Sequence, residues 1–275
     1  MQYESMNLWE NYDGDLHTDA ILHAYVPDNS PEIDMNRKRR AVLICPGGAY
    51  AMTSDREAEP VAFEFLRADM CAFVLRYSVA PNRHPIPLYE VSRAMWLIRQ
   101  NAERWHVDPS NIAVMGFSAG GHLAGSLGVF WNRDEIAQAL GMPKGMNQPN
   151  KLVLCYPVIL FDEKKGHVES FYNLLGKNQA REVYESMSLE RFVSADTPPT
   201  FLWHTYSDGA VPVDNSLAFA ESLRSFDIPF EMHIYPSGVH GLSLGDTRTA
   251  GPQSPDYVEP YLTNWIAHCI AWLKR

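Results

Sequence analysis

Short runs of consecutive apolar residues alternate along the chain with longer segments in which apolar residues recur every three or four positions. Residues 41–45, 71–75 and 112–115 have the length and composition of strands that are buried on both faces. Residues 57–68 and 91–105 show the spacing of amphipathic helices. The same patterns predict further strands at 1–8, 18–26, 151–156, 201–205 and 230–235, and further helices at 213–226 and 260–273.

Strands that alternate with helices at this spacing form βαβ units, so we predict an α/β fold with a mainly parallel sheet of about eight strands and helices on both faces. Charged and helical pieces interrupt the alternation between residues 158 and 197. We interpret this segment as a small inserted cap, and a plain surface excursion is the alternative. No Pro/Gly/Ser-rich linker or internal repeat divides the 275 residues, which predicts one domain over 1–275.

The segment Gly116-Phe117-Ser118-Ala119-Gly120 follows the apolar run 112–115 and opens a helical stretch. Strand, G-x-S-x-G and helix together are typical of a turn that exposes a nucleophilic serine, with room only for small residues beside it. The amide of Ala119 then lies at a helix N-terminus, where it can face a developing oxyanion. Because the bare pattern is short and glycine is common, its meaning depends on partners elsewhere in the chain.

Those partners follow the last two expected strands. In parallel sheets, functional groups collect at the carboxyl ends of the strands, and a serine nucleophile on such a turn is followed along the chain by an acid and then a histidine. Asp208 follows the strand at 201–205, and His240 follows the last strand in a glycine-containing loop. We therefore predict Ser118 as nucleophile, His240 as base and Asp208 as orienting acid, with Asp162 as the fallback acid.

The segment Pro46-Gly47-Gly48-Ala49-Tyr50, directly after the strand at 41–45, is the second expected element of this site. Glycine lets a backbone approach a ligand closely, so we predict that the amides of Gly48 and Ala49, with that of Ala119, form an oxyanion hole. An ordinary strand-ending turn is the alternative. His122 and His204 are expected to be core or supporting histidines. No cluster has metal-ligand spacing, so we expect neither metal nor cofactor.

The amino-acid composition disfavours some classes of binding partner. The chain carries 23 Lys and Arg against 33 Asp and Glu, a net charge of −10, which disfavours nucleic acid or an anionic membrane as partner. The one basic run, residues 37–40, is expected to be a solvated loop. The first fifteen residues have neither the cationic start nor the apolar stretch of a secretory signal, and the cysteines at 45, 71, 155 and 269 lie in apolar segments. We therefore expect buried free thiols and a cytoplasmic protein, with a homodimer left open.

Five blocks of the chain resemble the α/β-hydrolases, near the bacterial acetyl-xylan-esterase-like group of carbohydrate esterases, with hormone-sensitive-lipase-like and prolyl-oligopeptidase-like enzymes as relatives. The blocks are CPGGAY at 45–50, RYSVAPNRHPIPLYE at 76–90, DPSNIAVMGFSAGGHLA at 108–124, PPTFLWHTYSDGAVPVDNSLAFAESL at 198–223 and PFEMHIYPSGVHGLSL at 229–244. The resemblance implies an α/β-hydrolase fold with the three residues above as its catalytic triad.

Three positions depart from the pattern of these families. Ala49 stands where lipase-like esterases have a further glycine, Ser207 stands where the carbohydrate esterases often have a second aspartate, and Glu90 replaces an aspartate at the start of a helix. Asp208 is therefore the sole acid candidate in its loop, and we expect Glu90 to be structural.

The resemblance implies a serine carboxylesterase that removes short acyl groups, acetyl above all, from oligosaccharides such as acetylated xylo-oligosaccharides. The aromatic residues Tyr50, Tyr156, Tyr206 and Trp131 would lie near the mouth of the site and could stack on a sugar, although packing is the alternative. Other interpretations are a non-carbohydrate esterase, an amidase or peptidase of the prolyl-oligopeptidase type, and a non-catalytic binding protein on a hydrolase fold.

Overall fold

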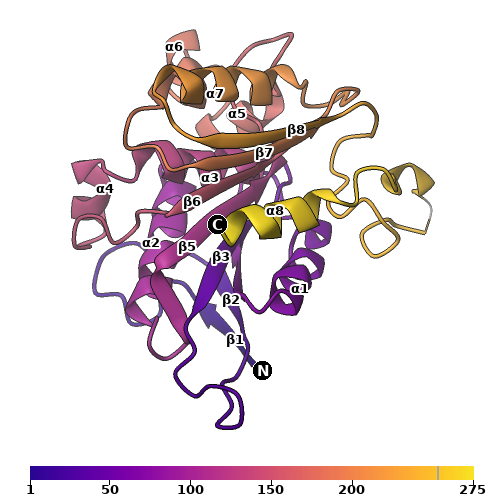
Figure 1. The fold of residues 1–275 in the computed structure, drawn as a ribbon. Helices are drawn as coiled ribbons and strands as arrows, with labels where there is room; N and C mark the ends of the chain where they lie inside the picture. The colour runs from indigo at the N-terminus through magenta and orange to yellow at the C-terminus, as the bar shows by residue number, and fades with distance from the viewer. Residues whose placement is uncertain (253) are drawn as a thin grey trace.

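A computed structural model of the chain describes residues 1–252 and 254–275. These residues form one eight-stranded sheet in the order β1-β2-β4-β3-β5-β6-β7-β8 (Figure 1). The strands are β1 (Gln2–Asn7), β2 (Ile21–Val26), β3 (Arg39–Cys45), β4 (Cys71–Arg76), β5 (Val107–Phe117), β6 (Lys151–Cys155), β7 (Thr200–Thr205) and β8 (Phe230–Tyr235). The pairs β1–β2 and β2–β4 are antiparallel and the other pairs are parallel, which confirms the predicted fold class.

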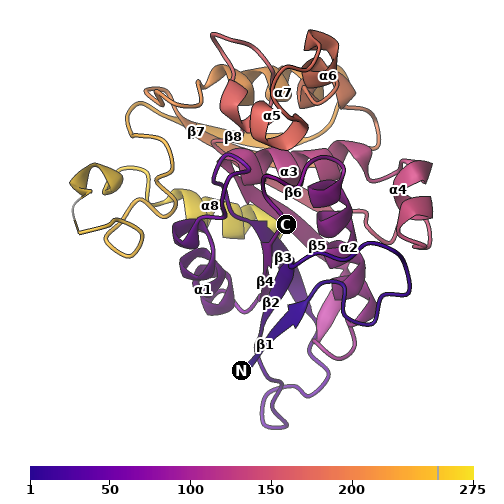
Figure 2. The same cartoon turned by 180° about the vertical axis from the view of Figure 1, so that it is seen from behind.

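Helices cover both faces of the sheet (Figures 1 and 2). They are α1 (Glu59–Arg67), α2 (Ile86–Gln100), α3 (Ser118–Phe130), α4 (Asp134–Ala139), α5 (Val168–Leu175), α6 (Arg181–Glu185), α7 (Asp214–Ser225) and α8 (Trp265–Leu273), with short 3₁₀ turns η1 (Asp55–Glu57), η2 (Leu189–Phe192) and η3 (Pro255–Tyr257).

The alternation of side chains along the central strands produces two apolar cores. In β3, Leu43 belongs to the core that includes residues of α2, α3 and α7, whereas Val42 and Ile44 belong to the core that includes residues of α1 and α8. Because both faces are covered, β3 is an almost continuous apolar run, as the sequence pattern indicated. The loops that follow these strands are thus carried on a rigid, doubly covered sheet.

The elements differ from the prediction mainly at their ends. The closing helix begins at Trp265 rather than at residue 260, α2 ends at Gln100 rather than near 105, and α4 was not anticipated. The basic run at 37–40 is not a simple solvated loop, because β3 begins at Arg39, whose buried side chain pairs with Asp69. The charge pattern alone did not indicate that β3 begins within the basic run, at its third residue.

The segment 158–197 contains α5, α6 and η2 and lies beside α7 at the carboxyl edge of the sheet (Figure 2). Buried Asn215 of α7 holds its start: the side-chain oxygen accepts hydrogen bonds from the amides of Ile159 (2.9 Å) and Leu160 (3.2 Å). His122 of α3 lies 2.8 Å from the carbonyl oxygen of Met187 through Nε2, and so holds the far end. The segment is therefore fastened to two core helices.

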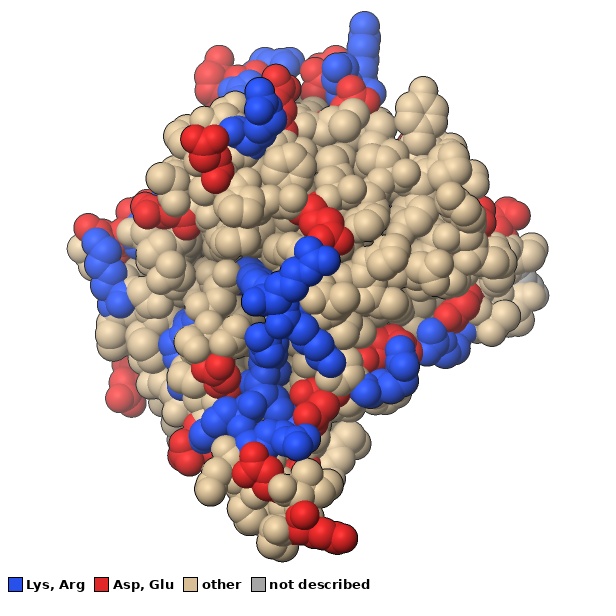
Figure 3. Space-filling view, viewed as in Figure 1, with Lys and Arg blue, Asp and Glu red and all other residues tan. Residues whose placement is uncertain are grey.

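Basic side chains form a band down the face shown in Figure 3, over the C-terminal end of α8. Lys151 donates hydrogen bonds to the carbonyls of Trp272 (3.0 Å) and Leu273 (3.2 Å), and Arg40 donates one to Lys274 (3.0 Å). Carbonyl groups at a helix C-terminus lack partners within the helix and carry partial negative charge, so these cations cap α8.

The four cysteines are buried and free, as predicted. None of the helices in the described residues combines the length and apolar character needed to cross a membrane. The compartment of the protein stays a prediction.

We predict that Gly120→Ala destabilises the protein by about 3 kcal/mol, because a Cβ there would overlap the carbonyl oxygens of Cys45 and Pro46 at the end of β3. The free energy of unfolding in urea measures the effect. Gly209→Ala is the matched control, since no described atom beyond the two adjacent residues lies within 4 Å of its added Cβ. Equal stability of the two variants would contradict the packing argument.

Candidate active site

The turn between β5 and α3 places Ser118 at the carboxyl edge of the sheet. Ser118 is the first residue of α3 and has φ of 52°, in the left-handed region that residues with a side chain rarely adopt. Such strain persists only where the surroundings enforce it and is common at functional sites. In this conformation the hydroxyl of Ser118 points away from α3 and toward the loop that follows β8.

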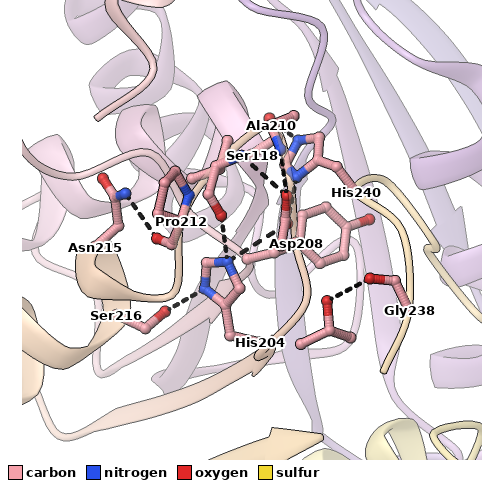
Figure 4. Close-up of polar contacts among 12 residues, drawn as sticks. Ser118, His204, Asp208, Ala210, Pro212, Asn215, Ser216, Gly238 and His240 are labelled. Carbon is pink, nitrogen blue, oxygen red and sulfur yellow. Dashed lines mark hydrogen bonds and ion pairs between the residues drawn. The ribbon is translucent and has the colours of Figure 1, made fainter. Parts of the chain in front are cut away.

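Ser118, His240 and Asp208 form a continuous hydrogen-bonded chain (Figure 4). The distance from Ser118 Oγ to His240 Nε2 is 2.8 Å, and that from His240 Nδ1 to Asp208 Oδ2 is 2.7 Å. A carboxylate can only accept, so Nδ1 carries the proton and Nε2 is free to accept from the serine hydroxyl. The structure thus brings together the three side chains that the sequence placed after three different strands.

Asp208 is fixed by its own loop. Its other oxygen, Oδ1, accepts hydrogen bonds from the amides of Ala210 and Val211, both at 2.9 Å. Burial alone would raise the pKa of this carboxyl, but hydrogen bonds with His204, His240 and the Val211 amide outweigh it and hold the pKa well below its usual value. Asp208 is therefore a carboxylate at neutral pH.

His204 supports this arrangement from inside β7. Its Nε2 lies 2.9 Å from the carbonyl oxygen of Val211 and 3.5 Å from Asp208 Oδ2, while Nδ1 lies 2.8 Å from Ser216 Oγ (Figure 4). The residue is fully buried, as predicted for a core histidine. Its contacts hold both the carboxylate and the turn that presents it.

Ser207 has a structural role in the same region. Its hydroxyl accepts a hydrogen bond from the amide of Gly238 at 3.0 Å, and Thr205 donates one to the carbonyl of Gly238 at 2.9 Å. These contacts tie the loop that carries His240 to the end of β7. Ser207 therefore connects the loop that carries Asp208 to the loop that carries His240.

The loop after β3 lies against the turn at Ser118. Gly48, Ala49 and Tyr50 all have positive φ, at 131°, 55° and 56°. The amides of Gly48 and Ala49 donate no hydrogen bond to any described residue, whereas the carbonyl of Gly48 accepts from Ala51 at 2.9 Å. Two free amides beside the serine, together with the Ala119 amide at the start of α3, fit the predicted oxyanion hole.

Glu57 holds this loop in place, and the sequence pattern did not identify it. The buried carboxylate accepts hydrogen bonds from the amide of Gly47 and from the hydroxyl of Tyr156, both at 2.7 Å. A Cβ at Gly47 would lie 2.8 Å from Glu57 Oε2 and 2.9 Å from Ser118 Cβ, so only glycine allows this approach. No local signal marks such a residue, because its partners come from distant parts of the chain.

A pocket of about 370 Å³ opens onto the serine and is lined by Gly48, Ala49, Arg56, Ser118, His167 and His240 among others. His167 comes from the segment 158–197, and burial together with repulsion from His240 lowers its pKa. A larger hollow of about 850 Å³ lies between the N-terminal segment, α2 and the end of α4, and shares no residue with this pocket. The hydrogen-bonded chain at Ser118 identifies the smaller pocket as the candidate active site.

The aromatic residues predicted to stack on a sugar do not line this pocket. Tyr50 and Tyr156 are buried, with their hydroxyls bonded to His122 (2.9 Å) and Glu57 (2.7 Å), so neither offers a free ring face, against the prediction. Tyr206 is 72% exposed but does not line the pocket. Trp131 donates to the carbonyl of Asp196 at 3.0 Å and packs against the core. Sequence alone does not indicate which aromatic rings are turned inward.

The remaining candidates have supporting roles. Asp162 accepts hydrogen bonds from the amides of Lys164 and Lys165 and has no contact with His240. His122 is buried against Tyr50, and burial lowers its pKa to about 4, so it is neutral at neutral pH.

Glu90 is buried and accepts hydrogen bonds from the Thr18 hydroxyl at 2.6 Å and from the Ser78 amide at 2.7 Å, as expected for a structural carboxylate. Within the described part of the chain, no group of three or more His, Cys, Asp or Glu side chains is arranged to hold a metal ion.

Comparison with known proteins identifies relatives over most of the chain. Residues 25–223 match the BD-FAE family. Endo-1,4-beta-xylanase B of Butyrivibrio fibrisolvens is 37% identical over 253 residues, which are 87% of this chain and 38% of that protein. An acetylxylan esterase of Xylanibacter ruminicola is 31% identical over 215 residues, which are 76% of this chain and 42% of that protein. The chain therefore spans about two fifths of the length of these two relatives.

A solved structure matches over nearly its whole length. The acetyl ester-xyloside bifunctional hydrolase from Caldicellulosiruptor lactoaceticus is 36% identical, with a TM-score of 0.82 and coverage of 98% of this chain and 95% of that chain.

We predict that Glu57→Gln lowers the free energy of unfolding by about 1–3 kcal/mol, because an amide can accept only one of the two hydrogen bonds and turns its NH₂ group toward the other donor. Urea unfolding measures the loss. Glu59→Gln is the control: it is exposed and accepts only one tyrosine hydroxyl, that of Tyr25 at 2.6 Å, and should shift stability by less than about 0.5 kcal/mol. A neutral Glu57→Gln variant would show that the buried carboxylate does not hold the loop.

Proposed function

The chain belongs to the BD-FAE family, in the acetylxylan-esterase-like group of α/β-hydrolases, and on this basis we propose that it is a serine carboxylesterase acting on short-chain acyl esters. The observation that carries the proposal is the hydrogen-bonded chain from Ser118 through His240 to Asp208 beside two unpartnered amides. Nucleophile, base, orienting acid and oxyanion donors are the parts that acyl transfer requires.

The proposed reaction begins when Ser118 Oγ attacks the ester carbonyl and its proton passes to His240 Nε2. The negative charge on the carbonyl oxygen is stabilised by the amides of Gly48, Ala49 and Ala119. His240 then gives the proton to the leaving alcohol, and the acyl-enzyme remains on Ser118. A water molecule then attacks the acyl carbon while His240 takes its proton. The bond between the acyl carbon and Ser118 Oγ breaks, and the proton passes from His240 to Oγ as the acid leaves.

Asp208 stabilises the positive charge that His240 carries between these proton transfers. Its low pKa keeps it ionised throughout, and its hydrogen bond to Nδ1 maintains the tautomer in which Nε2 faces the serine.

The proposed substrate is an acetyl ester of an oligosaccharide, such as an acetylated xylo-oligosaccharide. The names of two relatives support this choice, an acetylxylan esterase and an acetyl ester-xyloside hydrolase. The pocket of about 370 Å³ is open enough for the alcohol portion to extend outward while the small acyl group lies at the serine.

We predict that the rate on p-nitrophenyl esters falls steeply from acetate to butyrate to octanoate, and that Ser118→Ala abolishes all three activities while the fold is retained. Steady-state kinetics with circular dichroism on both proteins measure this. Residual activity of a folded Ser118→Ala variant would overturn the assignment of the nucleophile. A preference for the long chain would contradict the acetyl specificity, and activity confined to amides would replace the esterase proposal by an amidase.

We predict that Asp208→Asn lowers kcat about 10⁴-fold, because an asparagine stabilises the wrong tautomer of His240. Asp162→Asn is the matched control and should leave kcat unchanged, since its carboxylate only accepts amides of its own loop. Comparable losses in the two variants would show that Asp208 is not the orienting acid.

A further inference from the structure

The guanidinium of Arg56 is the one Arg or Lys side chain among the described residues that line the pocket, and the proposed chemistry does not use it. Arg56 belongs to η1 and lines the pocket together with Ser118 and His240. Its guanidinium carbon lies 4.2 Å from the centre of the Tyr257 ring, which also lines the pocket. A guanidinium stacked on an aromatic ring keeps its N–H edge open for a planar anion.

No described residue satisfies this charge. The neighbouring carboxylates have other partners: Asp55 pairs with Arg76 at 2.7 Å, and Glu57 accepts from Gly47 and Tyr156. The hydrogen bond that reaches Arg56 is made by Ser243 to its backbone carbonyl and does not involve the guanidinium. Arg56 is half-buried, so its charge is only partly screened by solvent.

The position of the Arg56 guanidinium places it near the alcohol portion of the ester. A Cβ built on Gly241, the residue after His240, would lie 3.3 Å from Arg56 Nη2, 3.8 Å from Tyr257 Cε1 and 4.0 Å from Glu57 Oε1. The leaving alcohol must lie against His240, because His240 donates its proton to that oxygen. Arg56 therefore lies beside the residue that follows His240, next to the place where the alcohol portion of the ester must lie.

We propose that Arg56, stacked on Tyr257, binds a carboxylate on the alcohol portion of the ester, so that the enzyme prefers acetyl esters of acidic sugars. The inference rests on the proposed esterase function and adds a substrate class to it. Arginine forms paired, charge-assisted hydrogen bonds with a carboxylate, which a neutral amide of the same shape does not replace. With a net charge of −10 the protein as a whole repels anions, so binding a carboxylate at the pocket requires a local cation.

Two matched acetyl esters test the proposal, meta-acetoxybenzoate and meta-acetoxybenzamide, which differ in charge and hardly in shape. The quantity measured is the ratio of their kcat/KM values. Arg56→Gln should lower this ratio about tenfold relative to the wild type. Arg67→Gln is the control, since the Arg67 side chain is 72% exposed on α1 and pairs with Glu64; it should leave the ratio and both rates unchanged.

A second measurement needs no variant. In the wild type, the ratio should fall as sodium chloride is raised, because salt screens the attraction to the carboxylate and leaves the amide substrate unaffected. A salt-independent ratio, or an unchanged ratio in folded Arg56→Gln, would overturn the role of Arg56. If the wild type cleaves neither these esters nor p-nitrophenyl acetate, the esterase proposal itself fails, which distinguishes the two outcomes.

Discussion

The close approach of two backbone segments is the constraint on which the site depends. The turn at Ser118, with φ of 52°, packs against the end of β3 so tightly that a side chain at Gly120 would overlap the carbonyls of Cys45 and Pro46. Because β3 and β5 are adjacent and parallel, the proposed nucleophile and the proposed oxyanion loop leave the sheet at the same edge and meet there. The sheet, covered on both faces, provides the rigidity that holds this strained contact, and the remaining site residues are placed around it.

Two buried carboxylates act in this site through different partners. Asp208 is turned toward an imidazole and two amides, so it orients His240, the proposed base. Glu57 accepts from one amide and one phenol, so it orients a backbone segment. Both are satisfied by fixed donors, which is the condition for burying a charge without a large penalty. Arg56 differs from them, because its charge is directed to the pocket and has no partner among the described residues.

The segment 158–197 links the core to the pocket. It is anchored by Asn215 and by His122, contributes His167 to the pocket, and through Asn173 donates a hydrogen bond to the carbonyl of Ala49 at 2.9 Å. The proposed oxyanion loop is therefore held at two points, by Glu57 at the amide of Gly47 and by this segment at the carbonyl of Ala49. In relatives that share the fold but differ in this segment, the pocket can differ while the chemistry at the serine stays the same.

The sequence by itself determined the alternation of strands and helices, and through it the edge where Ser118, Asp208 and His240 gather, because apolar periodicity and glycine-rich turns are local properties. It also indicated the buried thiols and the core position of His204. Only the tertiary structure decided which aromatic rings face inward, so that Tyr50 and Tyr156 became buried hydrogen-bonding residues. It alone decided that Glu57 meets Gly47 and Tyr156, and that Arg56 stacks on Tyr257 about two hundred residues away. Such contacts depend on how distant segments pack, and no local pattern in the chain encodes them.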